Sequence, residues 1–112
     1  MDNIKNDAYF AGRIKDDFAF IVKHMNTVDS EEFANNEILQ DSMMFRLIQI
    51  SENSRKLSEE YKQAHPSIPF IAMNGLRNRI VHDYGNVDLG IVFDTLKKDI
   101  PWLFDLMVEE AN

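Results

Sequence analysis

The segment RNRIVHDY, residues 77–84, gathers arginine, asparagine, histidine and tyrosine side chains in one short stretch. A guanidinium is a planar, permanently charged donor that matches a phosphate, and an imidazole takes up and releases a proton near neutral pH. These groups suit the cleavage of RNA without a metal ion. His82 would deprotonate a 2′-hydroxyl or protonate the leaving oxygen. Arg77 would stabilise charge on the phosphorane-like transition state.

The spacing of these residues limits how one chain can use them. In a helix, Asn78 and His82 share a face, and so do Arg77 and Tyr84. Arg77 and His82, by contrast, are separated by about 140° of helical rotation. One histidine also cannot easily act as both base and acid. A two-fold dimer would supply a second copy of the motif, so the spacing favours a site at a dimer interface.

The same segment admits structural explanations. Arg79 and Asp83 are four residues apart, which is the spacing of a surface ion pair on a helix. A histidine beside an aspartate at a helix end is commonly a cap or a packed polar contact. Spacing alone therefore leaves catalytic and structural roles both open.

Other kinds of active site lack support in the sequence. The absence of cysteine excludes disulfides, thiolate metal sites and thiol nucleophiles. His24 and His65 have no partners at metal-ligand spacing. The glycines are scattered and form no phosphate loop, and no serine lies in a nucleophile elbow. We therefore expect no metal site and no cofactor.

Length and charge restrict the class of protein further. The chain has 112 residues, which predicts one domain over residues 1–112, and its formal net charge is −7. A protein that coats nucleic acid would carry a positive net charge, so any contact of this chain with RNA must be limited to a local cationic surface. The start of the sequence has no apolar segment typical of a secretory signal, and no apolar run is long enough to span a bilayer. We expect a soluble, cytoplasmic protein.

Apolar residues at helical spacing predict the elements that position the motif. They indicate a helix over residues 3–26 and a long helix, straight or bent, over residues 35–62. The prolines of HPSIPF, residues 65–70, interrupt this pattern. A third helix would begin near Pro69 and run into the motif, and YGN, residues 84–86, would end it. The helical pattern resumes at Asp88 and continues to the C-terminal part.

This pattern predicts an all-α, up-and-down bundle of four to five helices. The methionines and phenylalanines fall largely on the inner stripes, so we expect them to fill the core. The charged and polar mixture over residues 51–62 is typical of a solvated helix face.

The segment IPFIAMNGLRNRIVHDYGNVDLGIVFDTLKKDIPWL, residues 68–103, resembles the C-terminal half of the HepT-like toxins of the HEPN superfamily. The earlier segments DAYFAGRIKDDFAFI and FRLIQISENSRKLSEEYK are similar to the first two long helices of these toxins. Several residues recur in these toxins in the same order. They are the arginine, the asparagine that follows it, the histidine, the tyrosine two residues later, and the flanking "IP" and "VDL" residues. The resemblance covers nearly the whole chain.

The resemblance implies an all-helical homodimer that acts as a metal-independent endoribonuclease, the toxin of a toxin–antitoxin pair. The family motif falls on Arg77, His82 and Tyr84, with Asn78 as its polar position and Arg79 beside it. It also implies a partner, a minimal nucleotidyltransferase antitoxin that transfers AMP to Tyr84. An anionic adduct there would compete with RNA phosphate for Arg77.

Two other classes of function stay open. One is a catalytically inert HEPN module that binds nucleotide or a nucleotidyltransferase. The other is a structural helical dimerisation protein. The complete set of Arg77, His82 and Tyr84 favours the ribonuclease, because a binding module has no need for all three.

Overall fold

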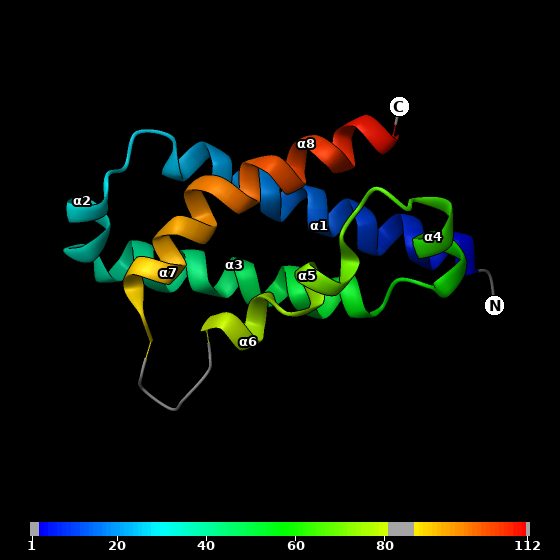
Figure 1. Ribbon diagram of the computed structural model, residues 1–112, viewed down its shortest axis with the longest axis horizontal. Coiled ribbons are helices and arrows are strands. Elements are labelled where there is room, and N and C mark those ends of the chain that lie inside the picture. Colours follow the sequence, from blue (N-terminus) through cyan, green and yellow to red (C-terminus); the bar gives the residue numbers. More distant parts are fainter. Residues whose placement is uncertain (1–2, 81–86, 112) are drawn as a thin grey trace.

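The computed structural model describes residues 3–80 and 87–111, and these residues form helices joined by short turns (Figure 1). No strand is present in the described ranges, so the all-α prediction is confirmed. The long helices are α1 (Asn3–Met25), α3 (Glu37–Arg55) and α8 (Ile100–Ala111). The shorter elements are α2 (Ser30–Ala34), α4 (Glu59–Ala64), α5 (Phe70–Asn74), α6 (Leu76–Ile80), α7 (Leu89–Asp94) and the π-helical turn η1 (Thr95–Asp99).

The core lies where α1 packs against α3 on one side and α8 on the other. The apolar stripe of α1 is largely buried there: Ile14, Phe18, Ile21 and Met25 are buried, and Val22 is partly buried. Phe18 meets Phe104 of α8 edge to face, with ring centroids 6.5 Å apart. Burial of this stripe, rather than helix propensity, holds α1 in place.

The long helix expected over residues 35–62 is divided in two. α3 ends at Arg55, and α4 begins with Ser58 as its N-cap residue, whose hydroxyl accepts from the amide of Tyr61. Asp7 of α1 fixes this turn, because its carboxylate accepts from the Ser58 amide at 2.8 Å and from the Ser58 hydroxyl at 2.5 Å. The bend in the second predicted helix is therefore a capped helix boundary.

The C-terminal helical pattern is continuous in space, but one turn is wound more loosely. Asp88 caps α7 by accepting from the amides of Gly90 and Ile91. The π-helical turn η1 then leads into α8, where Pro101 lies in the first turn. Proline cannot donate an amide hydrogen bond to the preceding turn, and this favours a local change of winding. The turn places Asp99 beside α6, where it contacts the motif.

In the ranges that the structure describes, no helix has both the length and the apolar character needed to cross a bilayer.

Candidate active site

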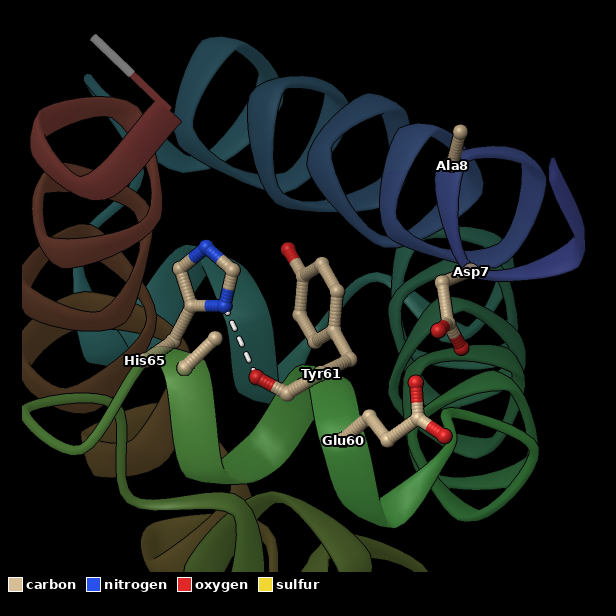
Figure 2. A pocket seen from close by; sticks show the side chains of 6 residues that line it. Asp7, Ala8, Glu60, Tyr61 and His65 are labelled. Carbon is tan, nitrogen blue, oxygen red and sulfur yellow. Dashed lines mark hydrogen bonds between the residues drawn. The ribbon is translucent and has the colours of Figure 1, made fainter. Parts of the chain in front are cut away.

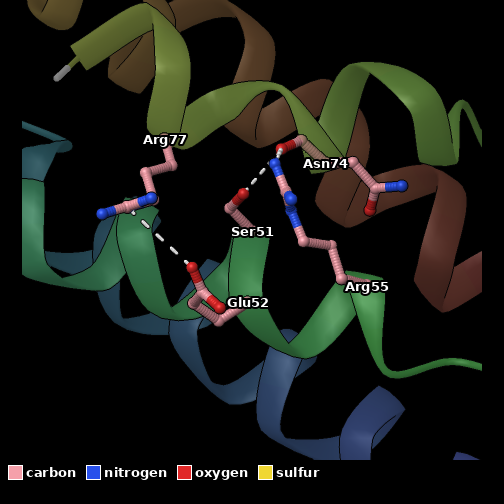
Figure 3. Close-up of polar contacts among 5 residues, drawn as sticks. All are labelled: Ser51, Glu52, Arg55, Asn74 and Arg77. Carbon is pink, nitrogen blue, oxygen red and sulfur yellow. Dashed lines mark hydrogen bonds and ion pairs between the residues drawn. The ribbon is translucent and has the colours of Figure 1, made fainter. Parts of the chain in front are cut away.

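The third predicted helix is broken just before the motif. We expected one helix from Pro69 into the motif, but α5 ends at Asn74 and α6 begins at Leu76. The backbone carbonyl of Asn74 accepts from the Ser51 hydroxyl at 2.7 Å and from Nη2 of Arg55 at 3.2 Å (Figure 3). In an unbroken helix this carbonyl would accept a hydrogen bond from the backbone amide four residues later. Contacts with α3 therefore accompany the break.

The side chain of Asn74 is held by α3 as well. Its Oδ1 accepts from the hydroxyl of Ser54 at 2.7 Å. Ser51 and Ser54 are fully buried and Asn53 is nearly so, so the prediction of a solvated face over residues 51–62 is wrong at these positions. A serine can be buried at low cost when its hydroxyl is hydrogen-bonded. These contacts fix the start of α6 against α3.

Arg77 extends from α6 toward the outer side of α3 (Figure 3). Its Nε lies 3.9 Å from Oε1 of Glu52, and the two side chains are 50% and 45% exposed. A long, half-exposed ion pair of this kind is weak, typically below about 1 kcal/mol. The Arg77 guanidinium is thus oriented toward α3 while remaining open to an anionic ligand.

Asn78 and Arg79 are both exposed on α6. Arg79 Nη1 donates to Oδ2 of Asp99 at 3.0 Å, which ties α6 to η1. Asp83, the partner that the spacing suggested for Arg79, lies outside the described residues. Arg77 and Arg79 therefore contact different elements, α3 and η1, and do not form one cationic pair in this chain.

His82 and Tyr84 lie in residues 81–86, outside the described ranges. The structure thus places three of the predicted site residues, Arg77, Asn78 and Arg79, and all three are on α6.

An exposed row on one face of α3 carries the apolar residues Ile38 and Phe45, with the charged Asp41 between them, and reaches Glu52, the partner of Arg77. Ile38 and Phe45 are 84% and 56% exposed, and Glu52 follows at the same seven-residue spacing, which keeps one face of a helix. Ile48, partly exposed, lies beside this row. Large apolar side chains left exposed together are typical of interaction surfaces.

A cavity of about 410 Å³ lies between the start of α1 and α4, away from these residues (Figure 2). Its wall includes Tyr61 and His65, whose rings stack with centroids 4.2 Å apart, and His65 Nδ1 is 2.8 Å from the Tyr61 carbonyl oxygen. A carbonyl oxygen only accepts, so Nδ1 carries the proton. No predicted site residue lines this cavity.

Among the described side chains, no group of three or more histidine, cysteine or acidic residues is placed to hold a metal ion.

Residues 14–109 match the family model described as Ribonuclease HepT-like. The chain belongs to this family. The match runs from the middle of α1 into the last turn of α8 and includes the whole segment from Ser51 to Asp99 that supports the motif. The resemblance seen in the sequence is therefore confirmed, and with it a HEPN-type, all-α fold.

Several proteins similar to this HepT-like chain are named as ribonucleases. A candidate RNase of Methanocaldococcus jannaschii is 32% identical over 81 residues, covering 72% of this chain and 70% of that protein. A Thermococcus cleftensis protein named "Probable ribonuclease HepT" is 33% identical over 73 residues, 65% of this chain and 66% of that protein. A candidate RNase of Caldanaerobacter subterraneus is 26% identical over 84 residues, 75% of each chain. No solved structure gave a significant match. Family and relatives together support an RNase.

Sequence reasoning missed the polar contacts that hold α6. Ser51 and Ser54 are spaced three apart, but nothing in the sequence pairs them with Asn74, which lies twenty or more positions away. An asparagine just before the motif was the only available signal.

Proposed function

We propose that this HepT-like chain is a metal-independent endoribonuclease, the toxin of a HEPN–nucleotidyltransferase toxin–antitoxin module. The observation that carries the proposal is the placement of Arg77. The described part of α6, tied to α3 and η1, presents its guanidinium on the surface, where Glu52 is a weak acidic partner. A phosphate can displace such a partner, because a guanidinium and a phosphate form strong, charge-assisted hydrogen bonds.

In the proposed reaction, a 2′-hydroxyl of RNA attacks the adjacent phosphorus and the 5′-oxygen of the next nucleotide leaves. His82 takes the proton of the hydroxyl, or gives one to the leaving oxygen. Arg77 binds the non-bridging oxygens as negative charge develops on them. Asn78 follows Arg77 on the exposed side of α6 and would assist in holding the phosphate. The products are a 2′,3′-cyclic phosphate and a free 5′-hydroxyl.

We further propose that two copies of the chain form the site. One histidine supplies one proton transfer, and a two-fold dimer brings His82 of each copy to a shared interface. The exposed apolar row of Ile38 and Phe45 on α3 supports this arrangement, because it leads directly to Glu52 and Arg77. Burial of this row in a dimer would place the two motifs close together.

Tyr84 would be the acceptor of AMP from a minimal nucleotidyltransferase partner. Its phenolic oxygen attacks the α-phosphorus of ATP, a Tyr–O–P bond forms, and pyrophosphate leaves with the electrons of the broken P–O bond. The attached phosphate would occupy Arg77 and exclude RNA.

The test is cleavage of labelled RNA by the purified protein in EDTA, with wild type beside His82→Ala and Arg77→Ala. We expect cleavage by the wild type alone, with cyclic phosphate at the new 3′-end. A requirement for added divalent cation would contradict the metal-independent mechanism. If no protein cuts a broad panel of RNAs, the inert HEPN binding module is the better description.

A further inference from the structure

Arg55 brings a second guanidinium to the surface that Arg77 occupies. It is the last residue of α3, its side chain is exposed, and its Nη2 donates to the Asn74 carbonyl at 3.2 Å. In Figure 3 the guanidinium groups of Arg55 and Arg77 both lie between α3 and the α5–α6 segment. The family motif does not include Arg55, because it lies more than twenty residues before Arg77.

The charge of Arg55 is not compensated within the described part of the chain. Arg46, Arg77 and Arg79 each have a carboxylate within ion-pair distance, and Arg55 has none there. In a chain with a net charge of −7, such a cation beside the motif is a local site for an anion. Glu52, the partner of Arg77, is only one helical turn away on α3.

The hydrogen bond to Asn74 orients the Arg55 side chain and leaves most of its N–H donors available for a ligand. A guanidinium has five N–H donors, and the Asn74 carbonyl engages Nη2 alone. Ser51 donates to the same carbonyl and fixes its position. A long side chain held in this way loses less conformational entropy when it binds a ligand.

We propose that Arg55 binds a backbone phosphate of the RNA strand next to the phosphate that Arg77 contacts. The proposal rests on the proposed function, since it deepens the description of the same site. Arg55 would contribute to strand affinity rather than to the chemical step, because its phosphate is not the reacting one. Its contribution would depend on charge and hence on salt concentration.

The experiment measures binding of a short, fluorescent, single-stranded 2′-O-methyl RNA, which lacks the attacking hydroxyl and cannot be cut. Dissociation constants are determined over a salt series for wild type, Arg55→Met and Arg55→Lys. We expect Arg55→Met to weaken binding about tenfold, the loss of one charge-assisted hydrogen bond. The slope of log affinity against log salt should fall by about 0.7, the value for one phosphate contact on a single strand. Arg55→Lys should restore most of the slope.

Two controls separate charge from structure. Arg13→Met removes the same charge from an exposed arginine on α1 and should leave affinity and slope nearly unchanged. Ser42→Ala changes a serine of α3 that makes no contact with Asn74 in the described contacts, without altering charge, so its affinity and salt slope should equal those of wild type. An Arg55→Met protein with wild-type affinity and slope would overturn the proposal, as would a wild type that does not bind the strand. Binding of this strand together with failure to cut ordinary labelled RNA would instead contradict the ribonuclease alone.

Discussion

The hydroxyl of Ser54 donates to Oδ1 of Asn74 at 2.7 Å, and this contact joins the interior of α3 to the last residue of α5. Arg77 follows Asn74 by three residues, so the position of its backbone depends on a polar contact buried beneath it. Ser51 and Arg55 secure the backbone of the same asparagine. The proposed site is therefore held by hydrogen bonds between α3 and Asn74 as well as by the burial of Leu76 and Ile80 of α6 in the core.

Ser54→Ala should destabilise the protein, because it leaves the side-chain oxygen of Asn74 without its donor. The expected loss in free energy of unfolding is about 1–3 kcal/mol. Urea denaturation measures it. Ser42→Ala, in the same helix and only partly buried, is the matched control and should change stability by less than about 0.5 kcal/mol. Equal effects of the two substitutions would mean that the Asn74 contact contributes nothing.

Arg46 and Arg77 should differ sharply in their contributions to stability. Arg46 pairs with Asp17 at 2.7 Å and stacks over the Phe20 ring, and the Asp17 side chain is 4% exposed. Arg46→Met would leave that buried carboxylate unpaired and should cost about 2–4 kcal/mol, discounted for the partial exposure of Arg46. Arg77→Met should cost less than about 1 kcal/mol. Thermal unfolding of the two variants tests the contrast, and an unstable Arg77→Met would weaken the use of Arg77 variants as probes of catalysis.

Phe45→Asp should convert the proposed dimer to a monomer. The substitution places a charge in the exposed apolar row of α3, where a partner subunit would have to desolvate it. Trp102→Asp on α8 is the matched control, because Trp102 is 55% exposed and Phe45 is 56% exposed. Sedimentation velocity should show a dimer for wild type and Trp102→Asp, and a monomer for Phe45→Asp. A wild type that is monomeric at micromolar concentration would contradict the shared site.

Gly75→Ala should be tolerated although Gly75 lies between α5 and α6. Its backbone has φ of −84°, which any residue adopts, and an added Cβ would meet only carbonyl oxygens at 3.6 Å. We expect stability to be unchanged or raised by up to about 1 kcal/mol, because alanine restricts the unfolded chain. At Gly90, a Cβ would lie 3.2 Å from Oδ1 of Asp88, the cap of α7, so Gly90→Ala should be destabilising. Thermal unfolding of both variants measures these effects. A strongly destabilised Gly75→Ala would mean that the break between α5 and α6 requires glycine.

The sequence predicted those features of the fold that depend on local periodicity, such as α1 and its buried face. The stripe of Ile14, Phe18 and Ile21 gave α1 and its buried face, because apolar spacing directly reports which side of a helix is covered. Asp88 likewise marked the start of α7, since a cap acts on its own first turn. These features need no knowledge of the rest of the chain.

The polar support of the site was not predictable in the same way. Ser51 and Ser54 have the composition of a solvated face, and only the approach of Asn74 makes their burial favourable. Asp99 contacts Arg79 from η1, and nothing in the sequence indicated this contact; the expected contact with Asp83 lies outside the described residues. Both contacts join residues about twenty positions apart, and helical spacing carries no information over such a distance.

The break at Asn74 also determines when the site can form during folding. The described part of α6, Leu76–Ile80, is tied to α3 through Asn74 and to η1 through Arg79, and these elements lie on either side of it in the sequence. α6 therefore depends on both of them for its position. A chain that has emerged from the ribosome only as far as Ile80 would have the contacts with α3 but would lack Asp99, so Arg77 would lie on a segment anchored only at its start. Hydrogen exchange should accordingly show the amides of α6 opening together with those of η1 rather than with the ends of α1.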